Sequence, residues 1–99
     1  MTGASTLRVA VHLPGALADL ASSRTLELTL ASPSDVGAAL DRLAQDQPMV
    51  ARRLRDETGA LRRYVNVYLD GVDVRSRSGL RTPLADGSVL EVVPSVAGG

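Results

Sequence analysis

The most informative part of the sequence is its end, which reads DGSVLEVVP over residues 86–94 and SVAGG over residues 95–99. The Asp-Gly pair at its start is typical of a tight turn, because both residue types tolerate the backbone angles that a turn requires. Residues 89–93 then predict a β-strand, and Pro94 ends it because proline has no N–H group to donate to a neighbouring strand. We therefore expect an extended tail over residues 95–99, which leaves the sheet directly after this strand.

Three earlier segments show the pattern of strands with one buried face. Residues 7–13, 25–30 and 64–69 each alternate between apolar and polar side chains, which is the period of a half-buried strand. An Asp-Gly pair at residues 70–71 follows as a hairpin turn signal, and residues 72–75 predict a short return strand. Together with the last strand, these segments can form one sheet.

One amphipathic helix is predicted between the second and third of these segments. Val36, Leu40 and Leu43 follow helical spacing, so they would pack together on the sheet. Ser32 can cap the first backbone N–H groups of this helix, and the proline after it suits the first helical position. Two further short helical turns are expected, over residues 16–23 and 49–54.

This order of elements predicts an α+β domain, with a mixed sheet of four to five strands and one main helix packed on one face. A helix on one face leaves the other face open, and we expect that open face to be a docking surface. By alternation, the open face would carry Arg8, Ala10, His12, Tyr64, Asn66, Tyr68, Val89, Glu91 and Val93. We expect a single domain over residues 1–99, with a flexible leader at residues 1–5 and the tail at residues 95–99.

The composition excludes several classes of site. The 99 residues include no cysteine, so the chain has no disulfide, no thiol nucleophile and no thiolate metal ligand. His12 is the only histidine, and it has no partners at the spacing of a catalytic triad or a metal site. We therefore expect no catalytic side chain and no bound metal: the protein should not be an enzyme.

Charge and hydropathy also restrict the partners. The formal net charge is zero, which gives no long-range attraction to nucleic acid or to an anionic membrane. No apolar run approaches the roughly 18 residues of a membrane-spanning helix. We therefore expect a cytoplasmic protein that binds neither nucleic acid nor a membrane.

Positive charge is concentrated in one part of the sequence. The arginines there are Arg52, Arg53, Arg55, Arg62 and Arg63. The simpler interpretation is a solvated helix edge and loop, interrupted by acidic residues 56–57. The alternative is docking against an acidic partner. Binding of nucleic acid is disfavoured, because the region has no basic strand with interleaved aromatic residues.

The order of elements, the DGSV motif at residues 86–89 and the ending VPSVAGG at residues 93–99 resemble the ubiquitin-like β-grasp sulfur carriers of the MoaD, ThiS and CysO families. The resemblance covers nearly the whole chain. RYVNVYL at residues 63–69, DVR at residues 73–75 and the later Gly-Leu pair at residues 79–80 are most similar to the CysO type, a carrier for cysteine biosynthesis. The chain departs from the pattern in its longer segment between the first two strands, and in its serine after Pro94.

The resemblance implies a function for the tail. The carboxylate of Gly99 would be adenylated and converted to a thiocarboxylate, and the carrier would then donate sulfur in the biosynthesis of cysteine or of another sulfur-containing metabolite. Val96, Ala97 and Gly98 would thread through a channel of the partner. The physical properties of the tail suit this role. Residues 95–99, when extended, reach roughly 16 Å, and the two terminal glycines have no Cβ, so they can pass a narrow channel.

The resemblance also implies partners. A ubiquitin-activating-type enzyme would bind and consume the ATP, so the carrier itself would bind no cofactor. For the CysO type, a pyridoxal-phosphate-dependent synthase would accept the sulfur and a metalloprotease would release the carrier-linked cysteine. Val93, Tyr68 and Tyr64 are the residues that we expect to help dock partners.

Three other functions are compatible with the same pattern. A MoaD-like protein would be the small subunit of molybdopterin synthase, in a permanent complex with the larger subunit. A protein modifier would be joined through Gly99 to lysines of its targets, as ubiquitin is. A passive β-grasp binding module would make no use of its tail.

Overall fold

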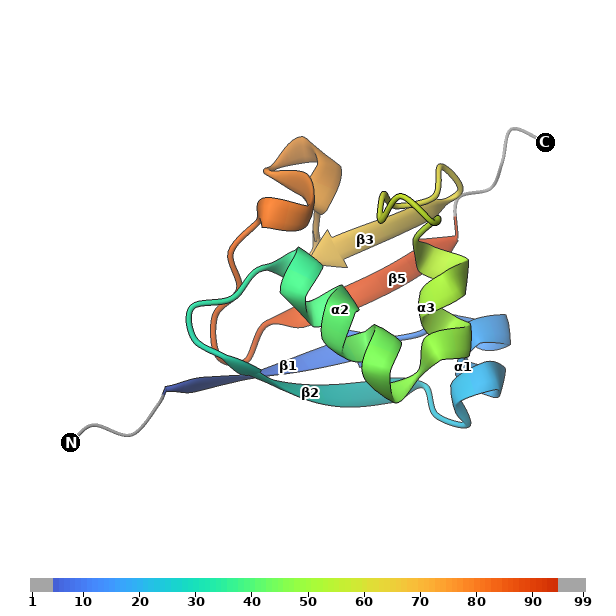
Figure 1. Ribbon diagram of the computed structural model, residues 1–99, viewed down its shortest axis with the longest axis horizontal. Helices are drawn as coiled ribbons and strands as arrows, with labels where there is room; N and C mark the ends of the chain where they lie inside the picture. The colour runs from blue at the N-terminus through green and yellow to red at the C-terminus, as the bar shows by residue number, and fades with distance from the viewer. Residues whose placement is uncertain (1–4, 95–99) are drawn as a thin grey trace.

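A five-stranded mixed sheet forms the body of the protein in a computed structural model, which describes residues 5–94 (Figure 1). Its strands are β1 (Thr6–His12), β2 (Thr25–Ala31), β3 (Val65–Leu69), β4 (Val72–Asp73) and β5 (Val89–Pro94). They lie side by side in the order β2-β1-β5-β3-β4, in which β1 and β5 are parallel and the other pairs are antiparallel. The last strand of the chain therefore lies in the middle of the sheet.

The alternation in the sequence sets which side chains enter the core. One side of the sheet buries Leu7, Val9, Val11, Leu28, Leu30, Val65, Val67, Leu69, Leu90 and Val92. These residues belong to one apolar cluster, and the strand residues between them are exposed or half-buried. Burial of this apolar surface is the main stabilising contribution to the fold. The predicted inward faces of the strands are confirmed.

Three α-helices accompany the sheet: α1 (Gly15–Ala21), α2 (Val36–Asp46) and α3 (Pro48–Leu54). Figure 1 shows α2 and α3 over one face of the sheet and α1 beside α3 at one end of the molecule. Val36, Leu40 and Leu43 of α2 are buried in the core, as their spacing predicts. The segment expected to form only a turn after residue 48 is a true helix, which begins with its proline in the first turn. Two short 3₁₀ helices, η1 (Val74–Ser76) and η2 (Gly79–Arg81), follow β4.

The predicted cap of α2 is wrong. Asp35 has extended backbone angles and caps the helix, because its carboxylate accepts a hydrogen bond from the backbone N–H of Ala38 at 2.8 Å. The reason is a contact far along the chain: Val36 donates to the carbonyl of Thr82, and Leu84 donates to that of Ser34. This bridge holds the residues before α2 extended, so the helix cannot begin at Ser32.

The turn after β3 follows its prediction, but the return strand does not. Asp70 and Gly71 have φ angles of 48° and 88°, which is the left-handed conformation expected of an Asp-Gly hairpin turn. The return strand β4 is only two residues long, and the chain then winds into η1. Asp73 directs this change, because its carboxylate accepts the backbone N–H of Arg75 at 2.8 Å.

Candidate functional site

The end of β5 fixes the point at which the predicted tail begins. Pro94 is the last described residue, and it lies opposite Val65 at the start of β3. Because β1 runs parallel to β5, the end of β1 lies at the same end of the sheet. The four residues predicted to act in the tail, Val96, Ala97, Gly98 and Gly99, lie outside the described residues, so their roles stay predictions.

Two of the three predicted docking residues share the open face of the sheet. The register places Val93 opposite Asn66 and Tyr68 opposite Glu91, so Tyr68 and Val93 are diagonal neighbours on one face. Both are half-buried. On the other side of β5, His12 lies next to Glu91. The uncovered face therefore offers a small apolar area around Val93 and Tyr68, bordered by polar side chains.

Tyr64 occupies a different place from the one that alternation predicts. The backbone N–H of Val65 donates to the carbonyl of Arg62 at 3.1 Å, which closes a turn immediately before β3. Tyr64 lies in this turn, and half of its surface (50%) is exposed. It lines a groove together with Leu17 of α1 and Arg53 of α3 instead of extending the face that carries Tyr68.

The turn before β3 is held from a third segment by Arg75. Strand β4 pairs only with Tyr68 and Leu69, so within residues 5–94 the first half of β3 has no neighbouring strand on that side. The guanidinium of Arg75 fills this position: it donates to the carbonyls of Val65 at 2.7 Å and Arg62 at 2.9 Å, and to the Asn66 side chain at 3.0 Å. Arginine suits this role because its planar group presents several donors at fixed angles. The sequence pattern gave no signal for these contacts.

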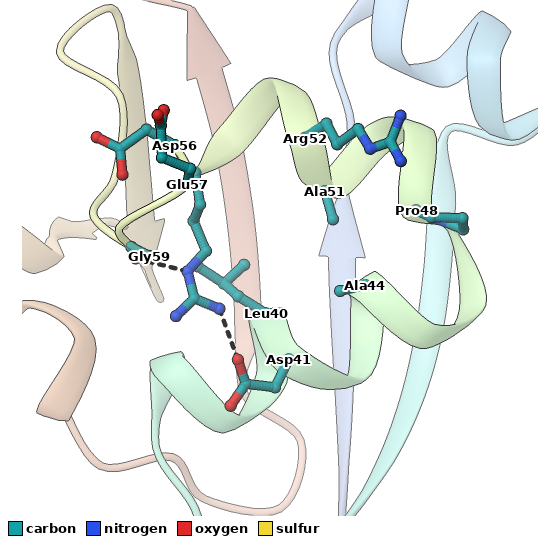
Figure 2. Close-up of a pocket in the computed structure, with 10 residues that line it drawn as sticks. Leu40, Asp41, Ala44, Pro48, Ala51, Arg52, Asp56, Glu57 and Gly59 are labelled. Atoms are coloured by element: carbon teal, nitrogen blue, oxygen red, sulfur yellow. Dashed lines mark hydrogen bonds and ion pairs between the residues drawn. The ribbon is translucent and has the colours of Figure 1, made fainter.

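A cavity of about 380 Å³ lies between α2, α3 and the loop after α3 (Figure 2). Arg55 crosses it and donates to the carboxylate of Asp41 and to the carbonyl of Gly59, both at 2.7 Å. Hydrogen bonds from the Thr58 hydroxyl and backbone lower the pKa of Asp56 at its edge. These groups bond to one another and fasten the loop to α2, so we assign this cavity a structural role.

The described part of the chain offers little for catalysis or for a metal. Within residues 5–94, no group of three or more histidine or carboxylate side chains is arranged to hold a metal ion. In the same range, none of the helices has the length and apolar character needed to cross a bilayer. The geometry instead provides two surfaces near the end of β5, which are the open face around Val93 and the groove that Tyr64 lines.

Comparison with known proteins identifies the family. A family model described as the ThiS family matches residues 11–99. The chain belongs to the ThiS family. The sulfur carrier protein CysO of Mycobacterium tuberculosis is 39% identical over 71 residues, which are 70% of this chain and 76% of that protein.

Two solved structures extend the similarity. The crystal structure of small archaeal modifier protein 1 from Haloferax volcanii has a TM-score of 0.80 and 30% identity, over 93% of this chain and 99% of the other. The crystal structure of the BexX/CysO complex from Amycolatopsis orientalis includes a chain with a TM-score of 0.74 and 31% identity, over 92% of this chain and 99% of that one. These matches confirm the ubiquitin-like β-grasp fold and the resemblance to the CysO type. The family is one of small carrier proteins, so the expectation that this chain is not an enzyme is confirmed.

Proposed function

We propose that this protein is a sulfur carrier whose Gly99 carboxylate is adenylated and then converted to a thiocarboxylate by a partner enzyme. The observation that carries this proposal is the match of the ThiS family model, which continues to residue 99 and so includes the Gly-Gly pair. The identity of 39% to a protein named sulfur carrier protein CysO supports it.

The chemistry requires no catalytic side chain from the carrier. A carboxylate oxygen of Gly99 attacks the α-phosphorus of ATP bound by the partner, and pyrophosphate leaves. A sulfur nucleophile supplied by the partner system then attacks the acyl carbon, and AMP leaves with the oxygen. The partner must hold the reacting atoms about 3 to 3.5 Å apart, which a narrow tail permits. The product is ionised and nucleophilic at neutral pH, by the reasoning that applies to a cysteine thiolate.

The proposed destination of the sulfur is cysteine or another sulfur-containing metabolite. The resemblance to the CysO type implies an acceptor enzyme of the pyridoxal-phosphate-dependent kind, followed by release of the product by a metalloprotease, and the 39% identity to CysO supports that type. The alternative within the same chemistry is the small subunit of molybdopterin synthase. Co-purification separates the two, because a MoaD-like subunit should be isolated in a stable complex with a large apolar interface.

Intact-mass measurement tests the proposed chemistry. After incubation with an activating enzyme of the ubiquitin-activating type, ATP and a sulfur source, the chain should gain about 16 Da, since sulfur replaces oxygen. A variant that lacks Gly99 is the control, and it should gain nothing while keeping its thermal transition. No mass change with the native chain would contradict the proposal. A large loss of stability in the control would mean that the tail is structural.

A second candidate function is conjugation to other proteins. It is favoured by the similarity to small archaeal modifier protein 1 of Haloferax volcanii, which is 32% identical over 83 residues. Epitope-tagged chain expressed in its native cells should then form isopeptide adducts that disappear when Gly99 is deleted. The sequence contains no lysine, so such adducts cannot be polymers through the chain's own side-chain amines. Complete absence of adducts under both sulfur-replete and sulfur-starved conditions would rule out this function.

A further inference from the structure

We propose that the groove between α1, α3 and the start of β3 is a second docking site, for a partner segment that carries an apolar side chain flanked by carboxylates. This docking groove has a volume of about 360 Å³, and its walls include Pro14, Leu17, Arg53, Tyr64, Val92 and Pro94. The proposal concerns recognition by the body of the protein, so it does not depend on the chemistry proposed for Gly99.

The shape and lining of the docking groove favour an apolar side chain. Its lining is mostly apolar and includes Pro14 and Leu17, Tyr64, and Val92 of the core. Tyr64 is one of the few large apolar side chains that remain half exposed in the described part of the chain, and it lines the groove. The volume is near the lower limit for small-molecule pockets, which suits one or two peptide side chains better than a cofactor.

The charge around the docking groove favours an acidic segment. Among the described residues, Arg53 is the one charged residue that lines the groove. Arg62 donates to the carbonyl of Arg52 through its side chain and to that of Leu54 through its backbone, which holds residues 62–64 against the end of α3. The exposed Arg63 is therefore brought to the same end of the molecule as Arg53.

Neither Arg53 nor Arg63 has an acidic partner among the described residues. Within residues 5–94, the ion pairs are Arg42 with Asp46 and Arg55 with Asp41, so both Arg53 and Arg63 lack one. Complementary charge at the border of an interface accelerates association and selects the partner more than it adds affinity. A peptide with carboxylates beside its apolar side chain would supply acidic partners for both arginines.

A second copy of the chain is a weaker candidate for the occupant. Val72 is 42% exposed and lies between Asp70 and Asp73, which resembles the required pattern. However, both carboxylates already accept backbone N–H groups, from Val89 and Arg75, at 2.9 and 2.8 Å. Such a contact would also join two different surfaces, and a head-to-tail contact of this kind tends to continue into a filament or ring. We therefore commit to a separate partner.

The position of the docking groove gives it a consequence for the tail. Pro94 lines the groove, whereas Val93 faces the opposite side of the sheet. A partner segment in the groove would contact the residue after which the tail begins. One partner could thus hold the end of β5 from both sides, with Val93 and Tyr68 on the open face and the docking groove on the helix side.

Nuclear magnetic resonance titration of the Gly99-deleted chain tests this proposal without any chemistry at the tail. The probe is a short peptide with one leucine flanked by glutamates, and the backbone amides of Ala16, Leu17 and Val65 should shift and saturate. A peptide with glutamines in place of the glutamates should associate more slowly and bind roughly threefold to fivefold more weakly, because exposed ion pairs speed association but add little affinity. Arg53→Glu should weaken binding of the acidic peptide by at least a similar factor.

Two controls keep the test specific. Arg77→Glu makes the same charge change in an exposed side chain after η1, and it should leave peptide binding and the thermal transition unaltered. Tyr64→Ser should weaken binding without unfolding the protein, because the side chain is half exposed.

Four outcomes would overturn the proposal. They are shifts confined to the open face, no saturable shift, equal binding by the Arg53→Glu variant, and groove shifts that depend on protein concentration without peptide. The last outcome would assign the groove to a second copy of the chain.

Discussion

Replacing Arg75 with alanine should destabilise the protein and loosen the turn that carries Tyr64. The guanidinium of Arg75 makes three hydrogen bonds to residues 62–66, and two of them go to backbone carbonyls on the side of β3 that β4 does not cover. Arg75→Ala removes all three from the free edge of β3. The acceptors are neutral, so added salt should change the effect only slightly.

The magnitude follows from the exposure of the site. A hydrogen bond contributes about 0.5–1.5 kcal/mol net, and an acceptor left buried costs more than one that water can reach. Arg75 is exposed overall, so water can replace part of what is lost. We therefore expect a total loss of about 1–2 kcal/mol in the free energy of unfolding. For a domain of this size, that loss lowers the melting temperature by roughly 4–16 °C.

Urea denaturation and amide hydrogen exchange measure the two effects separately. Arg77→Ala is the matched control, because it removes an exposed arginine two residues away without touching β3. Arg75→Lys should recover little, since an ammonium group cannot reach the three acceptors with the geometry of a planar guanidinium. Amides near residues 63–67 should exchange faster in Arg75→Ala. Equal stability of the Arg75→Ala and Arg77→Ala variants would refute the role of Arg75 in holding this edge.

Three further predictions concern other parts of the structure. Asp35→Ala should lower the free energy of unfolding by about 0.5–2 kcal/mol because it removes the cap of α2, whereas Ser32→Ala should change it very little. A larger loss for Ser32→Ala than for Asp35→Ala in urea denaturation would show that Ser32 caps the helix. Leu90→Ala should cost about 2–5 kcal/mol, because the side chain is 0% exposed in the central strand; a loss below about 1 kcal/mol would contradict its place in the core. The folded-state pKa of Asp56 should lie below 3.8, so its stabilising contribution is present above pH 3.8 and is lost as pH falls through the folded pKa. Thr58→Ala should raise this pKa towards 3.8 in a carboxyl-carbon titration, and an unchanged pKa would show that the Thr58 hydroxyl is not its cause.

Some of these substitutions should change stability, and others should change the binding of a partner. Loss of Asp35 or Leu90 should act through stability, because their side chains cap a helix and fill the core. Arg75 contributes to both stability and binding, because it holds the turn that carries Tyr64 in the lining of the docking groove. Its replacement should therefore weaken peptide binding as well as stability. Arg53→Glu should act mainly on binding, because Arg53 is exposed and its place in the last turn of α3 contributes only about 0.3–1 kcal/mol to stability.

Local sequence pattern was enough to predict several elements of the fold. Alternating apolar residues defined the buried face of each strand, and helical spacing defined the buried face of α2, because each period matches the geometry of its own element. The Asp-Gly turn after β3 was also readable, since its positive φ angles suit those residue types. The family followed from the order of these elements and from the Gly-Gly ending.

Other features depend on contacts between segments far apart in the chain, and local pattern did not predict them. Because residues 34–36 bridge to residues 82–84, α2 is capped by Asp35 and not by Ser32. Alternation placed Tyr64 on the open face, but the turn that closes at Val65 and is held by Arg75 places it in the lining of the docking groove. Periodicity describes neighbours along one element, whereas these contacts join elements whose relative positions are set by packing. For that reason the sequence indicated the tail and the open face, but the docking groove beside the end of β5 became visible only in three dimensions.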